Sequence, residues 1–293
     1  MTPAATKGLR YAVIGALSFS VMSAFAKLAG ERLPSQEIIF FRAIVVTGLT
    51  YYAIRNRKLD PWGPKRGLLL LRGLLGYSAL SCFLWAVIRL PLAETTVIHF
   101  TNPIWTALLA AVFIGEVLRG WEMILAVLAL GGVLMLARPG FLFGDVSGLD
   151  PAAVGAALAG AVLSAGAYVA AKKLTRTHDP LVIVFAFAFV SLVGSIPATV
   201  SGFVMPRGME WLILLGVGIG AQGGQIFVTK ALQVEKAGRV MAVGYLQIVF
   251  AAAWGLLLFQ EIPDLWTGLG AAIIIASTFL MARVHPVAAP RGR

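Results

Sequence analysis

Long apolar runs alternate with short polar connections along the whole chain. Ten of these runs approach the length of about 20 residues that a helix needs to cross a bilayer. They cover approximately 9–29, 35–54, 67–89, 92–113, 121–137, 149–171, 180–201, 208–230, 237–259 and 265–282. The connections leave no room for a soluble domain. The pattern therefore predicts an all-α integral membrane protein with ten transmembrane helices.

The first half of the chain repeats in the second half, without a gap, at a shift of 145 positions. Under this shift Glu116 falls on Glu261 and Trp121 falls on Trp266. Each match is weak alone, but the agreement of many matches on one shift predicts a duplicated unit. We assign residues 1–140 to a first five-helix repeat, 141–150 to a linker, and 151–293 to a second five-helix repeat.

The number of helices in each repeat determines how the repeats are related. Five crossings are an odd number, so the second repeat enters the membrane from the opposite side. We therefore expect two inverted repeats around a central cavity. Secondary transporters often use this construction, because two similar halves that exchange conformations open one site to each face in turn. The alternative is a duplication that only builds a stable bundle.

Composition identifies the solvent as lipid. The chain is 59% hydrophobic and 13% charged, with a mean hydropathy of +0.88, whereas soluble domains carry about 25% charged residues. The net charge of +11 comes from basic residues between apolar runs, which indicates membrane topology rather than nucleic-acid binding. Seventeen of the 24 Lys and Arg residues lie on one side if the N-terminus is cytoplasmic. Both termini are thus expected in the cytoplasm.

Polar side chains within the apolar segments are candidates for the cavity wall, because they are costly in lipid. Thr95, His99, Asn102 and Thr106 share one helical face, and Pro103 is expected to kink that helix. Hydrogen bonding between helices is the alternative role for each polar residue. The predicted substrate-binding residues are Tyr77, Ser81, His99, Asn102, Tyr168, Gln222, Gln225 and Gln247.

Two further residues are not assigned to the predicted substrate site. Tyr245 lies about 160° from Gln247 around an ideal helix, so it is not expected to face the cavity. Arg42 lies within the second segment and keeps an anionic substrate as a minor option. An uncharged cavity of Tyr, His, Asn and Gln suits a zwitterion with an apolar side chain better than a phosphate ester.

Other chemistry is not indicated. The sequence Gly218 to Gly223 matches the dinucleotide fingerprint, but no βαβ unit surrounds it. Gly216, Gly220 and Gly224 instead predict close helix packing. The only cysteine, Cys82, lies in an apolar segment and builds neither a disulfide nor a metal site. We expect no enzyme activity, metal or cofactor.

Acidic residues are expected only near segment ends. Glu116 and Glu261 each close an apolar helix and are interpreted as helix-end stabilisers. The usual carboxylate carrier of Na⁺ or H⁺ is then missing from the middle of the membrane. His99 would remain as a proton carrier; otherwise the protein is an uncoupled facilitator or is driven by the gradient of its substrate.

Several motifs together resemble one transporter family. They are Phe41-Arg42-Ala43, Pro103, the run 113–116 ending at Glu116 with its counterpart 258–261, and Trp121 with Trp266. With its two five-helix repeats, the chain resembles the EamA-type branch of the drug/metabolite transporter superfamily over nearly its full length. It departs where Ile248 replaces the counterpart of Pro103 and Phe187 replaces that of Arg42.

Within that family the chain looks most like the YddG-type aromatic amino-acid exporters. This resemblance implies alternating-access export of amino acids, aromatic or apolar ones preferred, or of similar small metabolites across a bacterial inner membrane. It also implies a cavity lined by helices one to four and six to nine. A monomer is expected, with an oligomer as the alternative. A multidrug or cation exporter of the same fold and a non-transporting scaffold are the alternative functions.

Overall fold

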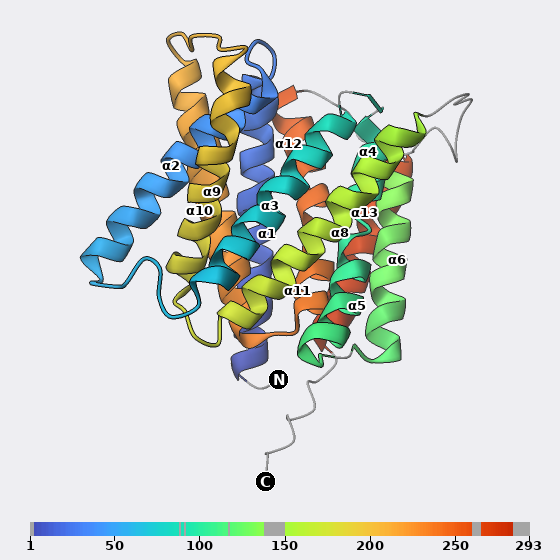
Figure 1. Cartoon of the computed structure of the whole chain (residues 1–293). Helices are drawn as coiled ribbons and strands as arrows, with labels where there is room; N and C mark the ends of the chain where they lie inside the picture. Colours follow the sequence, from blue (N-terminus) through green and yellow to red (C-terminus); the bar gives the residue numbers. More distant parts are fainter. Residues whose placement is uncertain are drawn as a thin grey trace.

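The computed structural model describes residues 3–87, 89–90, 92–116, 118–137, 150–259 and 265–283, and these are helical with no strand among them. The helices of the first half are α1 (Pro3–Ala29), α2 (Ser35–Asn56), α3 (Arg66–Val87), α4 (Leu92–His99), α5 (Asn102–Ile114) and α6 (Gly120–Ala137). Those of the second half are α8 (Pro151–Leu174), α9 (Pro180–Val200), α10 (Glu210–Val234), α11 (Ala237–Val243), α12 (Leu246–Phe259) and α13 (Leu265–Arg283). They form one bundle, with α1 beginning and α13 ending at the same end of it (Figure 1). We call this the termini end.

The structure confirms an all-helical membrane protein. Eight of the described segments are long and apolar enough to cross a membrane, and two shorter apolar helices cover Gly120–Leu136 and Leu265–Met281. Large apolar side chains cover the outside of the helices; Val112, Leu128, Ile219 and Leu257 are each at least half exposed. Such a surface is suited to acyl chains and not to water. Helices occupy most of the described residues of each expected segment, while the inverted arrangement remains a prediction.

Part of the predicted organisation lies outside the described residues. This applies to Glu261 and to all of the linker except its last residue, Asp150. The Asp150 side chain accepts a hydrogen bond from the backbone N–H of Ala152 and so caps α8. The second half therefore begins with a well-defined helix start.

The fourth and ninth expected helices are each broken in the middle. Residues Phe100 and Thr101 separate α4 from α5, just before Pro103, which confirms the expected kink. Gly244 and Tyr245 separate α11 from α12, although no proline occurs there. Under the 145-residue shift the two breaks overlap at Tyr245, so both halves share this feature without sharing its sequence.

Contacts between the halves come in matching pairs. Helix α1 packs on α10, and its counterpart α8 packs on α3. In the same way, the contact of α2 with α10 matches that of α9 with α3, and the contact of α5 with α8 matches that of α12 with α1. Helix α2 packs on its own counterpart α9, and α6 packs on its counterpart α13. Exchanging the halves therefore reproduces these pairs of contacts.

Glycines allow the closest of these contacts. A Cβ atom at Gly220 would lie 2.8 Å from the backbone nitrogen of Met22, and one at Gly224 would lie 2.6 Å from the ring of Phe19. Gly216 faces Phe25 in the same way. The interpretation of these α10 glycines as packing residues is confirmed.

Replacement of Gly220 by valine is expected to lower the free energy of unfolding by about 2–3 kcal/mol, because the new side chain would meet the backbone of α1. Chemical denaturation in detergent micelles measures this change. Gly48→Val on α2 is the matched control, since nothing lies within 4 Å of a Cβ built there. Equal stability of the two variants would contradict the close packing of α1 on α10.

Candidate substrate site between the two halves

Two arginines lie inside the membrane-spanning part of the bundle and face the same aromatic ring. Arg42 belongs to α2 and Arg72 to α3, each within a candidate membrane span. Their Cζ atoms lie 5.8 Å and 4.5 Å from the ring centroid of Phe187 on α9. These two distances place the Cζ atoms at most 10.3 Å apart. The two guanidinium groups therefore share one site, with the ring of Phe187 against both.

Two of the predicted site residues lie with this pair. The side-chain oxygen of Gln225 on α10 accepts a hydrogen bond of 3.3 Å from Nη2 of Arg72. The ring centroid of Tyr168 on α8 is 5.9 Å from Cζ of Arg72. The first half thus supplies the charges, and the second half supplies the aromatic and amide groups around them.

These arginines have unmet hydrogen-bonding capacity. Only 3% of the Arg72 surface is exposed, and neither its Nε nor that of Arg42 has a partner. The hydroxyl of Ser191 and the side-chain oxygen of Gln222 are likewise buried without a partner. Within the described part of the chain, no carboxylate forms an ion pair with either arginine. Buried cations are costly without a counter-charge, so an anion is the natural ligand for this site.

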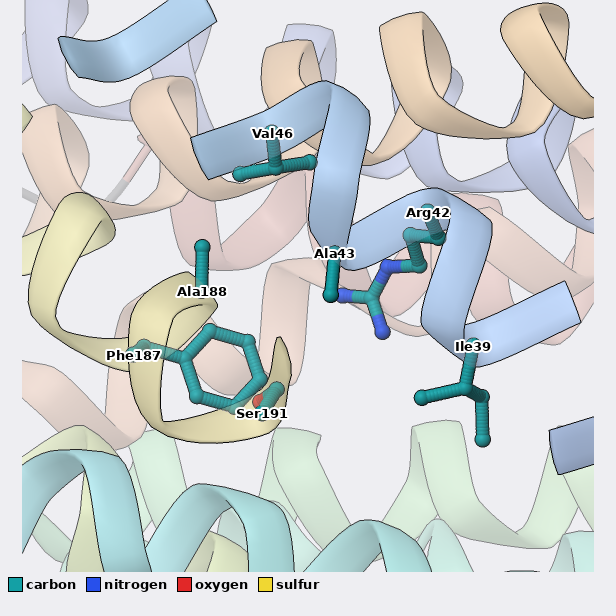
Figure 2. Close-up of a pocket in the computed structure, with 7 residues that line it drawn as sticks. All are labelled: Ile39, Arg42, Ala43, Val46, Phe187, Ala188 and Ser191. Carbon is teal, nitrogen blue, oxygen red and sulfur yellow. The ribbon is translucent and has the colours of Figure 1, made fainter. Parts of the chain in front are cut away.

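A small void borders the site. Its volume is about 10 Å³, the room that one water molecule takes. Figure 2 shows Arg42 reaching from α2 toward α9, where the ring of Phe187 and the hydroxyl of Ser191 lie. The remaining lining residues are Ile39, Ala43, Val46 and Ala188. A larger solute would enter only if α2 and α9 moved apart.

The interior contains two charged side chains, whereas the sequence analysis expected uncharged polar groups there. Sequence reasoning placed Arg42 within a segment but treated it as a minor option, and it ranked uncharged polar residues higher. The available signal was the position of two arginines inside apolar runs, where a charge is costly and usually functional. Their meeting at Phe187 depends on the packing of α2 and α3 against α9, which periodicity within one helix does not reveal.

Tyr77 and Ser81 both lie on α3. The hydroxyl of Tyr77 donates a hydrogen bond to the backbone carbonyl of Gly194 on α9. A Cβ atom at Gly194 would lie within 3 Å of the Tyr77 ring, so the two helices are closely joined here. Ser81 is partly buried one turn further along. Substrate contact by these two residues remains a prediction.

The other predicted residues lie near the two helix breaks. The ring of His99 packs on that of Phe83 at 4.7 Å between centroids, and its Nδ1 atom is buried without a partner. Asn102 is buried and accepts a hydrogen bond of 2.9 Å from the hydroxyl of Thr106. Gln247 is partly buried on α12. None of the interactions in the described residues joins these side chains to the arginine pair.

Tyr245 joins the two helix breaks directly. It is fully buried, and its hydroxyl donates a hydrogen bond of 2.8 Å to the backbone carbonyl of Phe100. Phe100 is the counterpart of Tyr245 under the 145-residue shift. The broken helices therefore meet at equivalent points. The angle between Tyr245 and Gln247 around the helix predicts only whether Tyr245 faces a cavity, so the sequence does not reveal this contact with Phe100.

At the termini end, an ionic network ties the halves together. Glu116 in the α5–α6 connection pairs with Lys172 on α8 at 3.2 Å and accepts a hydrogen bond from the backbone N–H of Ala237. Lys172 also donates to the backbone carbonyl of Glu235 at 2.6 Å. Lys236 pairs with Glu122 on α6 at 3.5 Å. Glu116 thus stabilises a helix end, as expected, but it does so across the two halves.

The opposite end of the bundle is also tied. Arg32, between α1 and α2, forms an ion pair with Glu210 at the start of α10 and donates to the carbonyl of Met205. The carboxylate of Glu37 accepts a hydrogen bond of 2.8 Å from the backbone N–H of Val204. Contacts between the halves therefore tie both ends of the bundle.

Comparison with known proteins identifies the family. Residues 6–138 and 151–283 both match the EamA-like transporter family, and the two matches are offset by the same 145 positions as the repeat. The chain is 36% identical over 278 residues to the pseudopaline exporter CntI of Pseudomonas aeruginosa, covering 94% of this chain and 96% of that protein. It is 34% identical over 282 residues to human solute carrier family 35 member G1, covering 92% and 77%.

Two further likenesses agree. The chain is 26% identical over 280 residues to the S-adenosylmethionine uptake transporter of Rickettsia felis, covering 94% of this chain and 92% of that protein. A crystal structure with 20% sequence identity has the same fold, with a TM-score of 0.76 over 92% of this chain and 97% of the other. The chain therefore belongs to the EamA-like transporter family, as a membrane transporter of small metabolites rather than an enzyme.

Proposed function

We propose that this protein is a secondary transporter that exports amino acids and similar carboxylate metabolites by alternating access. The observation that carries the proposal is the pair of arginines, Arg42 and Arg72, between the halves with unpartnered nitrogen atoms. A guanidinium group matches the two oxygens of a carboxylate, which makes arginine the usual residue for carboxylate binding. The ring of Phe187 offers an apolar surface beside the same group.

Alternating access is supported by the way the halves contact each other. The matching contacts, the two overlapping helix breaks and the ties at both ends suit two inverted repeats that exchange conformations. In this proposal, one set of ties opens while the other stays closed. The excess of basic residues in the connections supports a cytoplasmic location for the termini end.

Export rather than uptake rests on the resemblance to amino-acid exporters. The relatives named above include both an exporter and an uptake transporter, so family membership leaves the direction open. The preference for aromatic or apolar amino acids came from the same resemblance and from the expectation of an uncharged chamber, and the arginines bear on the second ground. The charge of the substrate therefore becomes the main question.

A multidrug or cation exporter is the second candidate, and the site disfavours it. A bulky cation would need a buried acid as its partner, whereas the described residues place two cations at the site. A non-transporting scaffold is the third candidate. A scaffold function does not explain why the Nε atoms of both arginines are buried without a hydrogen-bond partner.

Counterflow in liposomes that contain the purified protein separates these candidates. Radiolabelled amino acids are tested as a panel, and protein-free liposomes are the control. The proposal predicts saturable counterflow of at least one amino acid that ethidium does not inhibit. Inhibition by ethidium would favour the multidrug function, and no flux of any solute would favour the scaffold.

A further inference from the structure

We infer that Arg42 and Arg72 form a two-point anion site, so that the preferred substrate carries two carboxylates and a net negative charge. Acidic amino acids and small dicarboxylic acids belong to this class. The inference rests on the proposed function and makes it more specific, because it replaces an apolar side chain on the substrate by a second acid group.

The balance of charge favours two carboxylates over one. A zwitterionic amino acid brings a single carboxylate, which neutralises one guanidinium and leaves the other without a counter-charge. Its ammonium group would also lie near two cations, and no described acid is paired with either of them. A substrate with two carboxylates supplies one counter-charge to each arginine, of which Arg72 is buried and Arg42 is partly buried.

The separation of the two groups fits a short diacid. Both Cζ atoms lie against one ring and are at most 10.3 Å apart. Charge-assisted N–H···O contacts measure about 2.8 Å, so each carboxylate of a four- or five-carbon diacid would reach one guanidinium. Ser191, which lines the void, offers a hydroxyl without a partner to the rest of the molecule.

Comparison of the two repeats shows that the positive charges of the site lie on one side of it. The counterpart of Arg42 in the second half is Phe187, and the counterpart of Arg72 is Val217. Both charges therefore come from the first half, while the second half contributes a ring and polar uncharged groups. A substrate bound here would have its acid groups toward α2 and α3 and its carbon chain against α9.

Matched substrates that differ only in charge test the inference. Glutamate and glutamine have nearly the same shape, so their initial transport rates are compared in proteoliposomes at concentrations well below saturation, with phenylalanine as an apolar reference. The wild-type protein is expected to transport glutamate at least tenfold faster than glutamine or phenylalanine. Arg42→Gln is expected to reduce the glutamate rate at least tenfold and the glutamine rate less than threefold.

Arg55→Gln is the control, because Arg55 is an exposed arginine at the end of the same helix; its rates should match the wild type. Arg42→Lys keeps the charge but loses the planar fork, so it should retain part of the preference, and gel filtration checks that each variant is folded. Equal transport of glutamate and glutamine by the wild type would overturn this inference alone. The inference would also be overturned if folded Arg42→Gln kept the wild-type preference for glutamate over glutamine. No flux of any amino acid would contradict the proposed function as well.

Discussion

Replacement of Arg72 by glutamine is expected to reduce the transport of carboxylate substrates at least 100-fold while the fold is retained. Arg72 is 3% exposed, lies 4.5 Å from the ring of Phe187, and has an Nε atom without a partner. A hydrogen bond to a charged group contributes about 1.5–3 kcal/mol, and a bidentate contact provides two of them. A loss of about 3 kcal/mol corresponds to roughly 100-fold in binding.

Initial rates of counterflow, fitted to obtain kcat/KM, measure this effect. Arg55→Gln again controls for the loss of one arginine from a membrane helix. Since Arg72 has no counter-charge among the described residues, its removal should leave the stability unchanged or slightly higher. A variant that unfolds would assign Arg72 a structural role, and a folded variant with wild-type kcat/KM would remove it from the site.

Replacement of Lys172 by methionine is expected to lower the free energy of unfolding by about 3 kcal/mol. Lys172 is 9% exposed and its ammonium group has two partners, the carboxylate of Glu116 and the carbonyl of Glu235. Removing one member of a buried ion pair leaves the other charge without compensation, which costs more than the pair itself contributes. Chemical denaturation in detergent micelles gives the free-energy difference.

A double variant separates the lost pair from the lost packing. When Glu116→Gln accompanies Lys172→Met, no uncompensated charge remains, so we expect at least half of the stability to return. Lys173→Met is the matched control, because Lys173 is the exposed neighbour on the same helix, and it should change stability by less than about 0.5 kcal/mol. Equal losses for Lys172→Met and Lys173→Met would show that the network at the termini end contributes little.

The positions of the helices could be predicted from the sequence because lipid imposes a simple rule on apolar length. Helices occupy most of the described residues of each expected segment, and the break before Pro103 followed from the missing N–H of proline. The break at Gly244 and Tyr245 did not follow, since Ile248 stands where the first half has Pro103. In the structure, the hydroxyl of Tyr245 at this break donates a hydrogen bond to the carbonyl of Phe100, a contact between the halves that the sequence does not reveal.

The candidate site was only partly predictable. Spacing along one helix shows which residues share a face, and the predicted residues include Gln225 and Tyr168, which lie beside Arg72. Spacing does not show which faces of different helices meet. Arg42 and Arg72 were therefore not recognised as a pair, because their common neighbour, Phe187, comes from a third helix.

The central claim is that the space beside the arginine pair opens to each side of the membrane in turn. Ser191, which is 3% exposed and lines the small void, reports on this directly. Since Cys82 is the only cysteine in the chain, Cys82→Ala with Ser191→Cys places a single thiol at the site. A membrane-impermeant thiol reagent is then added to right-side-out and to inside-out vesicles. Alternating access predicts labelling from both sides, slowed by a transported substrate, whereas labelling from one side only or from neither would contradict alternating access at this site.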